Sequence, residues 1–471
     1  MLNKLTLVET IKKIKAKEFS HKELYLAIEK QIQESNKTFN IYLSLDKQAL
    51  QKAGKLLDTP LAGIPIAVKD NFLTKELPTT AASSVLKGFM SPYESTVTKK
   101  LMQSGGVVIG KTNMDAWAHG SSTETSDFGR TLNPRNIKYL PGGSSGGSSA
   151  AIAANMCTAA VGSETAGSIR QPASWCGVVG LKPTYGRVSR FGVVSMASST
   201  DSPGPIGKTV EDVSILFEQI AGHDDLDATT PKKEVPQVTK TIRQGVKGMR
   251  IGICYTDHPD LIDKKVTKQI LEAGKLFEKY GAQVTIVPVT EKLEKGKILK
   301  HDFSIGVYTV VQRSEVSSNL ARYDGIRYGQ NREYFGVEAK RRIMLGTFTL
   351  SKGYADKYYI KAQQVRNLYL QNFEQLFEGY DLLISPTTPS YAEPLGASIG
   401  NPMFGELEDM LLEPTSISGL PGISVPCYKD EQTNLYLGMN IVASWWQEEK
   451  MIQAAHLYES ETPWNSWRIY V

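Results

Sequence analysis

Short apolar runs alternate with helical patterns along the first third of the chain, and this alternation restricts the possible folds more than any other feature of the sequence. The segments GIPIAVKDNF (63–72) and VVIG (107–110) are brief and rich in β-branched residues, which is typical of buried strands. Residues 95–103 and the Ala-rich run SSAAIAANM (148–156) have helical patterns instead. Strands that alternate with helices predict an α/β fold.

Two longer segments flank this alternation. Residues 5–57 carry apolar positions at helical spacing, so we predict an N-terminal helical segment over about residues 1–57. Residues 222–247 are polar and poor in core residues, which predicts a surface connection before the strand MRIGIC (249–254). This connection is either a domain boundary or an excursion from a single domain.

The composition excludes several classes of protein. Of the 471 residues, 54 are basic and 49 acidic, and the charges are interspersed, so no basic stripe indicates direct binding of nucleic acid. No run approaches the ~20 apolar residues that a membrane-spanning helix needs, and no cleaved secretory signal is expected. The four cysteines are too far apart for a metal knuckle, which predicts buried reduced thiols at Cys157, Cys176, Cys254 and Cys427.

The segment GGVVIGKTN matches the GxxxxGK[ST] pattern of a phosphate loop from Gly105 to Thr112, which would make the chain an ATP-binding protein. A phosphate loop follows a strand and opens a helix, because its amides must point at the phosphates. Here a helical pattern precedes the segment, and Val107–Ile109 favour a buried strand. We therefore prefer a strand that ends in a turn and keep nucleotide binding as a remote alternative.

The run from Gly142 to Gly146 matches the GxSxG nucleophile elbow of α/β-hydrolases, with Ser144 as the nucleophile. That fold needs an acid and a histidine further along the chain. None of the histidines that follow stands in a distinctive setting, so this interpretation is the weaker one; they are His223, His258, His301 and His456.

A lysine and two serines form a third pattern, which accounts for more residues than either alternative. Lys69 ends a strand-like run, Ser144 stands in PGGSSGGSSA and Ser168 in GSETAGSIRQPAS. A neutral lysine can act as the base for a serine hydroxyl, provided that burial lowers its pKa. Glycines let backbone N–H groups approach a reacting carbonyl, where they stabilise the developing oxyanion. The pattern therefore predicts hydrolysis by a lysine-assisted serine.

The segments Gly142–Gly147 and Gly162–Ser168 resemble the two hallmark segments of the amidase-signature family, and Arg170 and Pro172 extend the match. The resemblance covers nearly the whole chain and implies a single domain over residues 1–471. It also implies the α/β amidase-signature fold, a large mixed β-sheet covered by helices on both faces. Within the family, the chain is most similar to glutaminase subunits of tRNA-dependent amidotransferases, through GSSTETS, GLKPTYGRVSRFG, SSNLARYDGIRYG, KRRIMLGTF and GLPGISVP.

The resemblance assigns a role to each member of a Ser-Ser-Lys triad. Ser168 is the nucleophile, Ser144 is the bridging serine after a non-proline cis peptide bond, and Lys69 is the terminal base. The proton of Ser168 then passes through Ser144 to the lysine. The oxyanion hole is implied to consist of the backbone amides of Thr165, Ala166, Gly167 and Ser168.

Similarity to the glutaminase subunits implies glutamine as the substrate, so its α-carboxylate and α-amino group need a cation and an anion. Position matching proposes Arg342 for the carboxylate, since a guanidinium binds a carboxylate through two parallel hydrogen bonds. The neighbouring Arg341 is the alternative ligand. Asp409 is proposed for the amino group and Tyr308 as a nearby wall of the site.

The same similarity implies partners. The ammonia released from glutamine would pass to a partner subunit that binds charged tRNA and uses ATP and Mg²⁺, while this chain holds no cofactor or metal. A small third subunit completes a heterotrimer, and the acceptor is Glu-tRNA(Gln), Asp-tRNA(Asn) or both. A cytoplasmic location is expected, in a bacterium in preference to an organelle. The alternative is a free-standing amidase for small acyl or aryl amides, which needs the triad but not Arg342 and Asp409.

Overall fold

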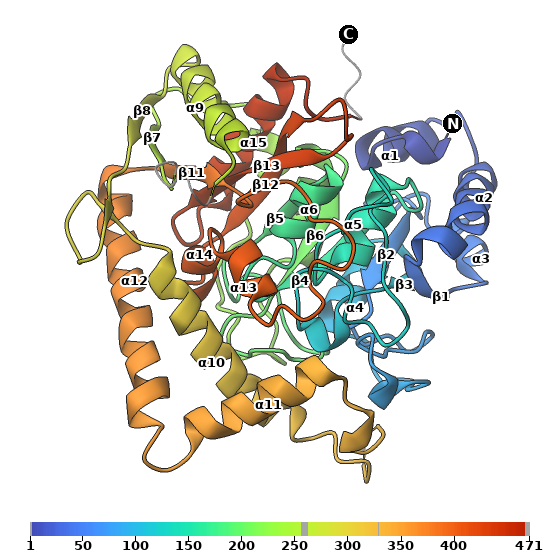
Figure 1. Ribbon diagram of the computed structural model, residues 1–471. Coiled ribbons are helices and arrows are strands. Elements are labelled where there is room, and N and C mark those ends of the chain that lie inside the picture. The colour runs from blue at the N-terminus through green and yellow to red at the C-terminus, as the bar shows by residue number, and fades with distance from the viewer. Residues whose placement is uncertain (1, 256–261, 328, 467–471) are drawn as a thin grey trace.

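A mixed sheet of eleven strands runs through the protein (Figure 1), which confirms the predicted α/β fold. The computed structural model describes residues 2–255, 262–327 and 329–466, so His258 and Tyr328 of the sequence patterns lie outside the described residues. In spatial order the strands are β1 (Tyr42–Leu45), β3 (Val107–Thr112), β2 (Pro65–Lys69), β4 (Ala159–Glu164), β6 (Ser202–Gly207), β5 (Val179–Lys182), β12 (Gly422–Lys429), β13 (Tyr436–Ala443), β11 (Leu382–Pro386), β7 (Arg250–Ile253) and β8 (Gln283–Ile286).

Both faces of the central strands are buried, because successive side chains enter two different hydrophobic cores. In β2, Ile66 and Val68 belong to one core and Ala67 to the other. Helices that contribute to the core around Ala67 are α2 (His21–Phe39), α3 (Ala49–Ala53) and α5 (Gly146–Ala153). Helices that contribute to the core around Ile66 include α4 (Thr96–Gln103), α7 (Val210–Ile220) and α9 (Lys264–Lys279). The predicted mixed sheet with helices on both faces is confirmed.

The N-terminal segment is helical as far as residue 39, but the prediction of helices throughout residues 5–57 is wrong. α1 (Leu7–Lys15) and α2 begin at capping boxes, formed by Thr6 with Glu9 and by Ser20 with Glu23. α2 ends at Asn40, whose φ of 51° is left-handed. Residues Tyr42–Leu45 then form β1, which pairs antiparallel with β3. Four residues are too few for a recognisable strand pattern, and this strand exists because of its pairing with β3.

The strands β2, β3 and β4 run parallel to one another, so their carboxyl ends meet at one edge of the sheet. Lys69 is the last residue of β2 and Glu164 the last of β4. The extended backbone of β3 rules out the phosphate loop, because its amides bind neighbouring strands. Lys111, the lysine of that pattern, is fully buried and forms an ion pair with Asp70 at 3.1 Å.

Three long helices lie together away from the N-terminal helices, in yellow to orange in Figure 1. They are α10 (Asp302–Leu320), α11 (Val337–Leu350) and α12 (Lys361–Gly379), and α10 packs against both of the others. Shorter elements complete the fold: α6 (Arg170–Cys176), α8 (Val238–Thr241), α13 (Phe404–Asp409), α14 (Glu413–Ile417), α15 (Glu448–Glu461) and the pair β9 (Val289–Thr290) and β10 (Ile298–Leu299).

The polar segment 222–247 contains the short helix α8 and is otherwise irregular. It contacts the core through three buried side chains, Val238, Ile242 and Val246. The four cysteines, all within the described residues, are buried and form no disulfide. None of the helices in the described part of the chain is both long enough and apolar enough to cross a membrane.

Candidate active site

Lys69 is fully buried at the end of β2, with three oxygens within hydrogen-bonding distance. Its Nζ lies 2.8 Å from Ser144 Oγ, 3.0 Å from the Ser163 carbonyl oxygen and 3.0 Å from Ser163 Oγ. Burial lowers the pKa of Lys69 to about 7, although the carboxylates of Asp115 and Asp201 act in the opposite direction. A lysine with this pKa is partly a free amine at neutral pH and can act as a base.

The contacts of Lys69 suit the free amine. A neutral amine has two N–H bonds and one lone pair. The carbonyl oxygen of Ser163 can only accept a hydrogen bond, and Ser163 Oγ already accepts one from Asn71 Nδ2 at 2.9 Å. When these two oxygens accept the two N–H bonds, the lone pair of Lys69 faces the Ser144 hydroxyl. Ser144 then donates to the amine, the arrangement that the predicted proton relay through Ser144 needs.

The pKa of Lys69 predicts the pH dependence of the reaction. Because the amine must be unprotonated to act as the base, kcat/KM should rise tenfold per pH unit below pH 7 and level off above about pH 7. The measurement is amide hydrolysis between pH 5 and 9, with circular dichroism at each pH to confirm folding. A rate that stays constant or falls across pH 6–8 would exclude a base with this pKa.

Ser144 and Ser168 lie on adjoining loops. The peptide bond between Gly143 and Ser144 is cis, as the resemblance implies. The Ser145 amide donates a hydrogen bond to the Ser168 carbonyl oxygen at 3.1 Å, which holds the two loops together. Ser144 is 0% exposed and Ser168 is 4% exposed. Ser144 therefore contacts the buried lysine, and the next residue in the chain is hydrogen-bonded to Ser168.

A buried ion pair fixes the loop that precedes and follows Ser168. The Glu164 carboxylate accepts hydrogen bonds from the amides of Ile169 and Arg170, each at 3.0 Å, and from Arg170 Nε at 2.9 Å. Ser416 Oγ donates to the Ala166 carbonyl oxygen. Glu164 thus binds the end of the loop that follows Ser168, and Ser416 of α14 binds the part that precedes it. The amides of residues 165–168, predicted as the oxyanion hole, belong to this fixed loop.

The glycine before Ser144 is held just as closely. A Cβ atom on Gly143 would lie 2.0 Å from Asp115 Oδ2, so no larger residue fits. The Gly143 amide donates to Gln171 Oε1 at 2.9 Å, and Gln171 Nε2 donates to the Ser121 carbonyl oxygen at 3.2 Å. Gln171 therefore ties the Ser144 loop to the segment around Ser121.

The two candidate carboxylate ligands, Arg341 and Arg342, differ sharply in environment. The buried face of α11 carries Ala339, Arg342 and Gly346, which recur at helical spacing. The Arg342 side chain is 4% exposed and that of Arg341 is 38% exposed. Although burial opposes the charge, the carboxylates of Glu406 and Glu338 raise the pKa of Arg342. Arg342 Nε contacts Glu338 at 2.7 Å, whereas its Nη1 is buried without a hydrogen-bond partner among the described residues.

Asp409 links the region around Arg342 to the loop of Ser168. A Cβ atom on Gly167 would lie 2.1 Å from Asp409 Oδ1, so the carboxylate lies directly against that loop. Asp409 Oδ2 accepts a hydrogen bond from Ser121 Oγ at 2.8 Å, while Oδ1 has no partner in the described part of the chain. Burial raises the pKa of Asp409 well above its usual range, and a bound ammonium group would favour the ionised form.

Tyr308 lies on α10 and is buried in the same region. Burial raises the pKa of its hydroxyl well above the usual range, and the charges of Arg342 and Asp409 both act on it. The three side chains predicted to bind glutamine are thus all buried, and Asp409 among them lies directly against the loop of Ser168.

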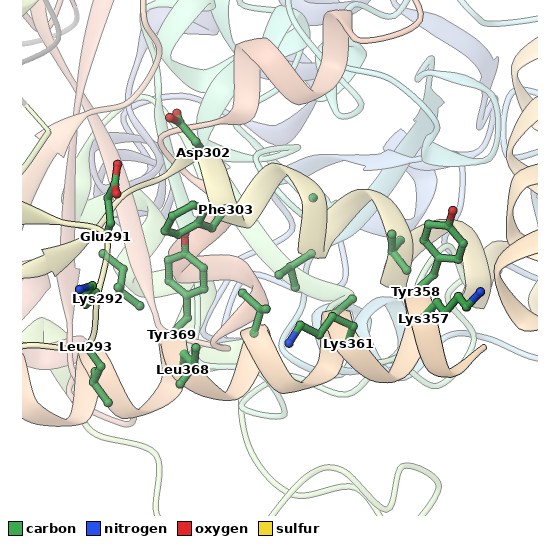
Figure 2. Close-up of a pocket in the computed structure, with 16 residues that line it drawn as sticks. Glu291, Lys292, Leu293, Asp302, Phe303, Lys357, Tyr358, Lys361, Leu368 and Tyr369 are labelled. Carbon is green, nitrogen blue, oxygen red and sulfur yellow. The ribbon is translucent and has the colours of Figure 1, made fainter. Parts of the chain in front are cut away.

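A separate cavity of about 750 Å³ lies between α10 and α12 (Figure 2). Its lining is mostly apolar, with Lys357 and Tyr358 toward one end and Glu291 and Asp302 toward the other. None of its lining residues belongs to the triad or to the three residues predicted to bind glutamine. This cavity therefore takes no part in the site described above.

The structure adds several residues to the site that the sequence patterns did not single out. Ser163 and Asn71 contact Lys69 or its partner, and Gln171 positions Gly143. A signal existed for Asn71 and Ser163, which stand within the same motifs as Lys69 and Ser168. Gln171 stands in the same motif as Ser168 as well, whereas no sequence pattern pointed to a role for His119.

The structure also decides against the GxSxG alternative. The group within hydrogen-bonding distance of Ser144 Oγ is the amine of Lys69. Of the candidate histidines, His223 bonds the Thr230 carbonyl oxygen at 2.7 Å, and His301 packs against Tyr255. Ser144 is therefore part of a lysine-based arrangement in the described structure.

Comparison with known proteins agrees with this geometry. The sequence model of the Amidase family matches residues 23–452. The glutamyl-tRNA(Gln) amidotransferase A subunit of Prochlorococcus marinus (strain NATL2A) is 43% identical, over 97% of this chain and 97% of that protein. The crystal structure of the corresponding A subunit from Thermotoga maritima is 38% identical with a TM-score of 0.83, covering 98% of this chain and 96% of that one.

A native peptide amidase from Stenotrophomonas maltophilia has the same fold, with a TM-score of 0.80 and 28% identity, over 97% of this chain and 96% of that one. The family match covers most of the chain, and the relatives align over nearly their full length. The chain therefore belongs to the Amidase family, in the group that contains the glutamyl-tRNA(Gln) amidotransferase A subunits.

Proposed function

We propose that this chain is the glutaminase subunit of a tRNA-dependent amidotransferase, which hydrolyses glutamine to glutamate and ammonia. The proposal depends on one observation: both the Lys69–Ser144 pair and Asp409 adjoin the loop of Ser168. The relay of Lys69 and Ser144 reaches the loop of Ser168 from one side. Asp409, with an unpartnered carboxylate oxygen among the described residues, lies against the same loop from the other side. An amide nucleophile beside a site for an amino-acid head group suits glutamine.

The proposed reaction uses Lys69, Ser144 and Ser168 as the triad. As Lys69 takes a proton from Ser144 and Ser144 takes one from Ser168, Ser168 Oγ attacks the side-chain amide carbon of glutamine. The backbone amides of residues 165–168 stabilise the oxyanion of the tetrahedral intermediate. The relay returns a proton to the amide nitrogen, the C–N bond breaks, and ammonia leaves. Water then hydrolyses the γ-glutamyl ester of Ser168, which releases glutamate and restores the serine.

The proposal includes the partner subunits that a tRNA-dependent amidotransferase needs in order to use the ammonia. The ammonia passes to a partner subunit that binds the charged tRNA, uses ATP and Mg²⁺, and amidates Glu-tRNA(Gln), Asp-tRNA(Asn) or both. A small third subunit completes a heterotrimer, which works in the cytoplasm. This chain contacts the tRNA indirectly, in keeping with its interspersed charges.

The test is ammonia release from glutamine by the chain assembled with its candidate partner subunits, coupled to formation of Gln-tRNA(Gln) or Asn-tRNA(Asn). Hydrolysis of glutamine with transfer of the nitrogen to tRNA supports the proposal. Hydrolysis of simple acyl or aryl amides without measurable hydrolysis of glutamine would contradict it and favour the free-standing amidase.

Replacing Arg342 with glutamine should raise the KM for glutamine by about 100-fold. Loss of a buried charged partner for a carboxylate costs roughly 2–5 kcal/mol, and 1.4 kcal/mol corresponds to a factor of ten. The compound 4-aminobutanamide lacks only the α-carboxylate of glutamine, so its hydrolysis should change little. Steady-state kinetics with both substrates make the measurement.

Arg341→Gln is the matched control, because the neighbouring side chain is far more exposed. It should change the KM for glutamine far less than Arg342→Gln, because the Arg341 side chain is 38% exposed and its Nη1 already donates to Glu338, although Arg341 lines the same small cavity as Arg342. If the two variants exchanged their effects, Arg341 would be the carboxylate ligand.

A further inference from the structure

A small polar cavity of about 70 Å³ lies beside the catalytic loops. Its lining includes His119, Ser121 and Arg342, together with the carboxylate side chains of Glu338 and Glu406. A cavity of this size holds a few water molecules or the head group of an amino acid. Ser121 donates a hydrogen bond to Asp409 Oδ2 at 2.8 Å, and Asp409 lies against Gly167, so a short chain of contacts joins the cavity lining to the loop of Ser168.

His119 has a backbone that is well anchored and a side chain that is not. Its amide donates to the Ala116 carbonyl oxygen at 3.0 Å, and its own carbonyl oxygen accepts from Thr125 Oγ1 at 3.3 Å. The residue is 0% exposed, yet both ring nitrogens lack a hydrogen-bond partner within the described structure. Buried polar atoms are nearly always hydrogen-bonded, so an imidazole that lines a cavity in this state is a candidate ligand-binding group.

The groups around His119 favour an anion. Burial and the positive charges of Arg342 and Arg313 hold the pKa of His119 well below its usual value, so the ring is neutral and one of its nitrogens donates. Arg342 Nη1 and Arg313 Nε are also buried without partners in the part of the chain that the structure describes. His119 and Arg342 therefore line the cavity with unused N–H donors, and a carboxylate supplies the matching acceptors. The two carboxylates of the lining, Glu338 and Glu406, are already bound to arginine side chains.

We propose that the His119 imidazole donates a hydrogen bond to the α-carboxylate of the substrate, beside the Arg342 guanidinium, and so selects free glutamine over amides without that group. The inference rests on the proposed function, because it assigns a residue to the recognition of glutamine. In this arrangement the α-carboxylate of glutamine lies toward His119 and Arg342, and its amino group lies toward Asp409. The side-chain amide is then directed to Ser168.

The test compares His119→Leu and His119→Gln in the assembled enzyme, with glutamine and 4-aminobutanamide as substrates. His119→Leu removes the donor and should raise the KM for glutamine about tenfold. The kcat should stay within about twofold, because the lost hydrogen bond stabilises the bound substrate and the transition state equally. Hydrolysis of 4-aminobutanamide should not change. His119→Gln retains an N–H donor and should recover most of the affinity for glutamine.

Each result separates the possible failures. An equal loss with both substrates would overturn the inference, because His119 would then act on the triad or on folding. An unchanged KM for glutamine in His119→Leu would overturn it as well. A wild-type enzyme that cleaves 4-aminobutanamide but not glutamine would reject the proposed function itself, whatever the variants do. Thermal unfolding of each variant verifies that the compared proteins are folded.

Discussion

Replacing Ser168 with alanine is expected to reduce glutamine hydrolysis by about 10⁴-fold or more, the scale of loss when a serine hydrolase loses its nucleophile. The alanine cannot form the γ-glutamyl ester, while Lys69 and Ser144 keep their 2.8 Å contact. Binding of glutamine should persist, since Arg342 and Asp409 are untouched. Ammonia release measures the loss, and equilibrium binding of radiolabelled glutamine measures the retained affinity.

Ser174→Ala is the matched control for this substitution. Ser174 is also buried, lies on α6 close to Ser168 in sequence, and has a hydroxyl without a partner in the described structure. Its removal should leave kcat and KM within about twofold of wild type, as for a substitution outside the site. If Ser168→Ala kept full activity, Ser168 could not be the nucleophile, and Ser144 would have to attack the amide directly.

Those parts of the fold with a strong local pattern were predictable from the sequence. β2 and β3 were expected because they are short apolar runs rich in β-branched residues, α4 because of its helical pattern, and α5 because of its Ala-rich run. β1 was missed because its four residues are stabilised by pairing with β3. The antiparallel pairing of β5 with β12 was equally hidden, since it joins segments more than two hundred residues apart along the chain, which no local pattern records.

The candidate site divides in the same way. Lys69, Ser144 and Ser168 stand in distinctive motifs, so the sequence alone was enough to select them. The choice between Arg341 and Arg342 depends on the rotation of α11 against α10, which the backbone of Gly346 permits by close approach to Arg313. The sequence did not predict a role for His119. Its ring is buried and has no hydrogen-bond partner among the described residues, and this can be seen only in the folded molecule.

Replacing Lys69 with methionine is expected to lower kcat/KM by about 10³-fold or more, toward the upper range for loss of a general base. Methionine fills a similar volume but offers no lone pair of comparable basicity to Ser144. Lys69→Arg should be as inactive, because a guanidinium keeps the positive charge and cannot become a free base near neutral pH. The pair of variants therefore separates a base from a merely electrostatic role, and kcat/KM for glutamine measures both.

Lys182 provides the control, since the chain contains a second buried lysine in a similar state. Burial lowers the pKa of Lys182 to about 7 as well, but the oxygens that its Nζ contacts are the carbonyls of Leu420 at 2.6 Å and Pro183 at 3.4 Å, which have no proton to give. Lys182→Met should lower thermal stability while activity per folded molecule stays within about threefold, because the lost contact is structural. An active Lys69→Arg enzyme would contradict the base role of Lys69, since the lowered pKa that permits proton transfer would then have no part in the reaction.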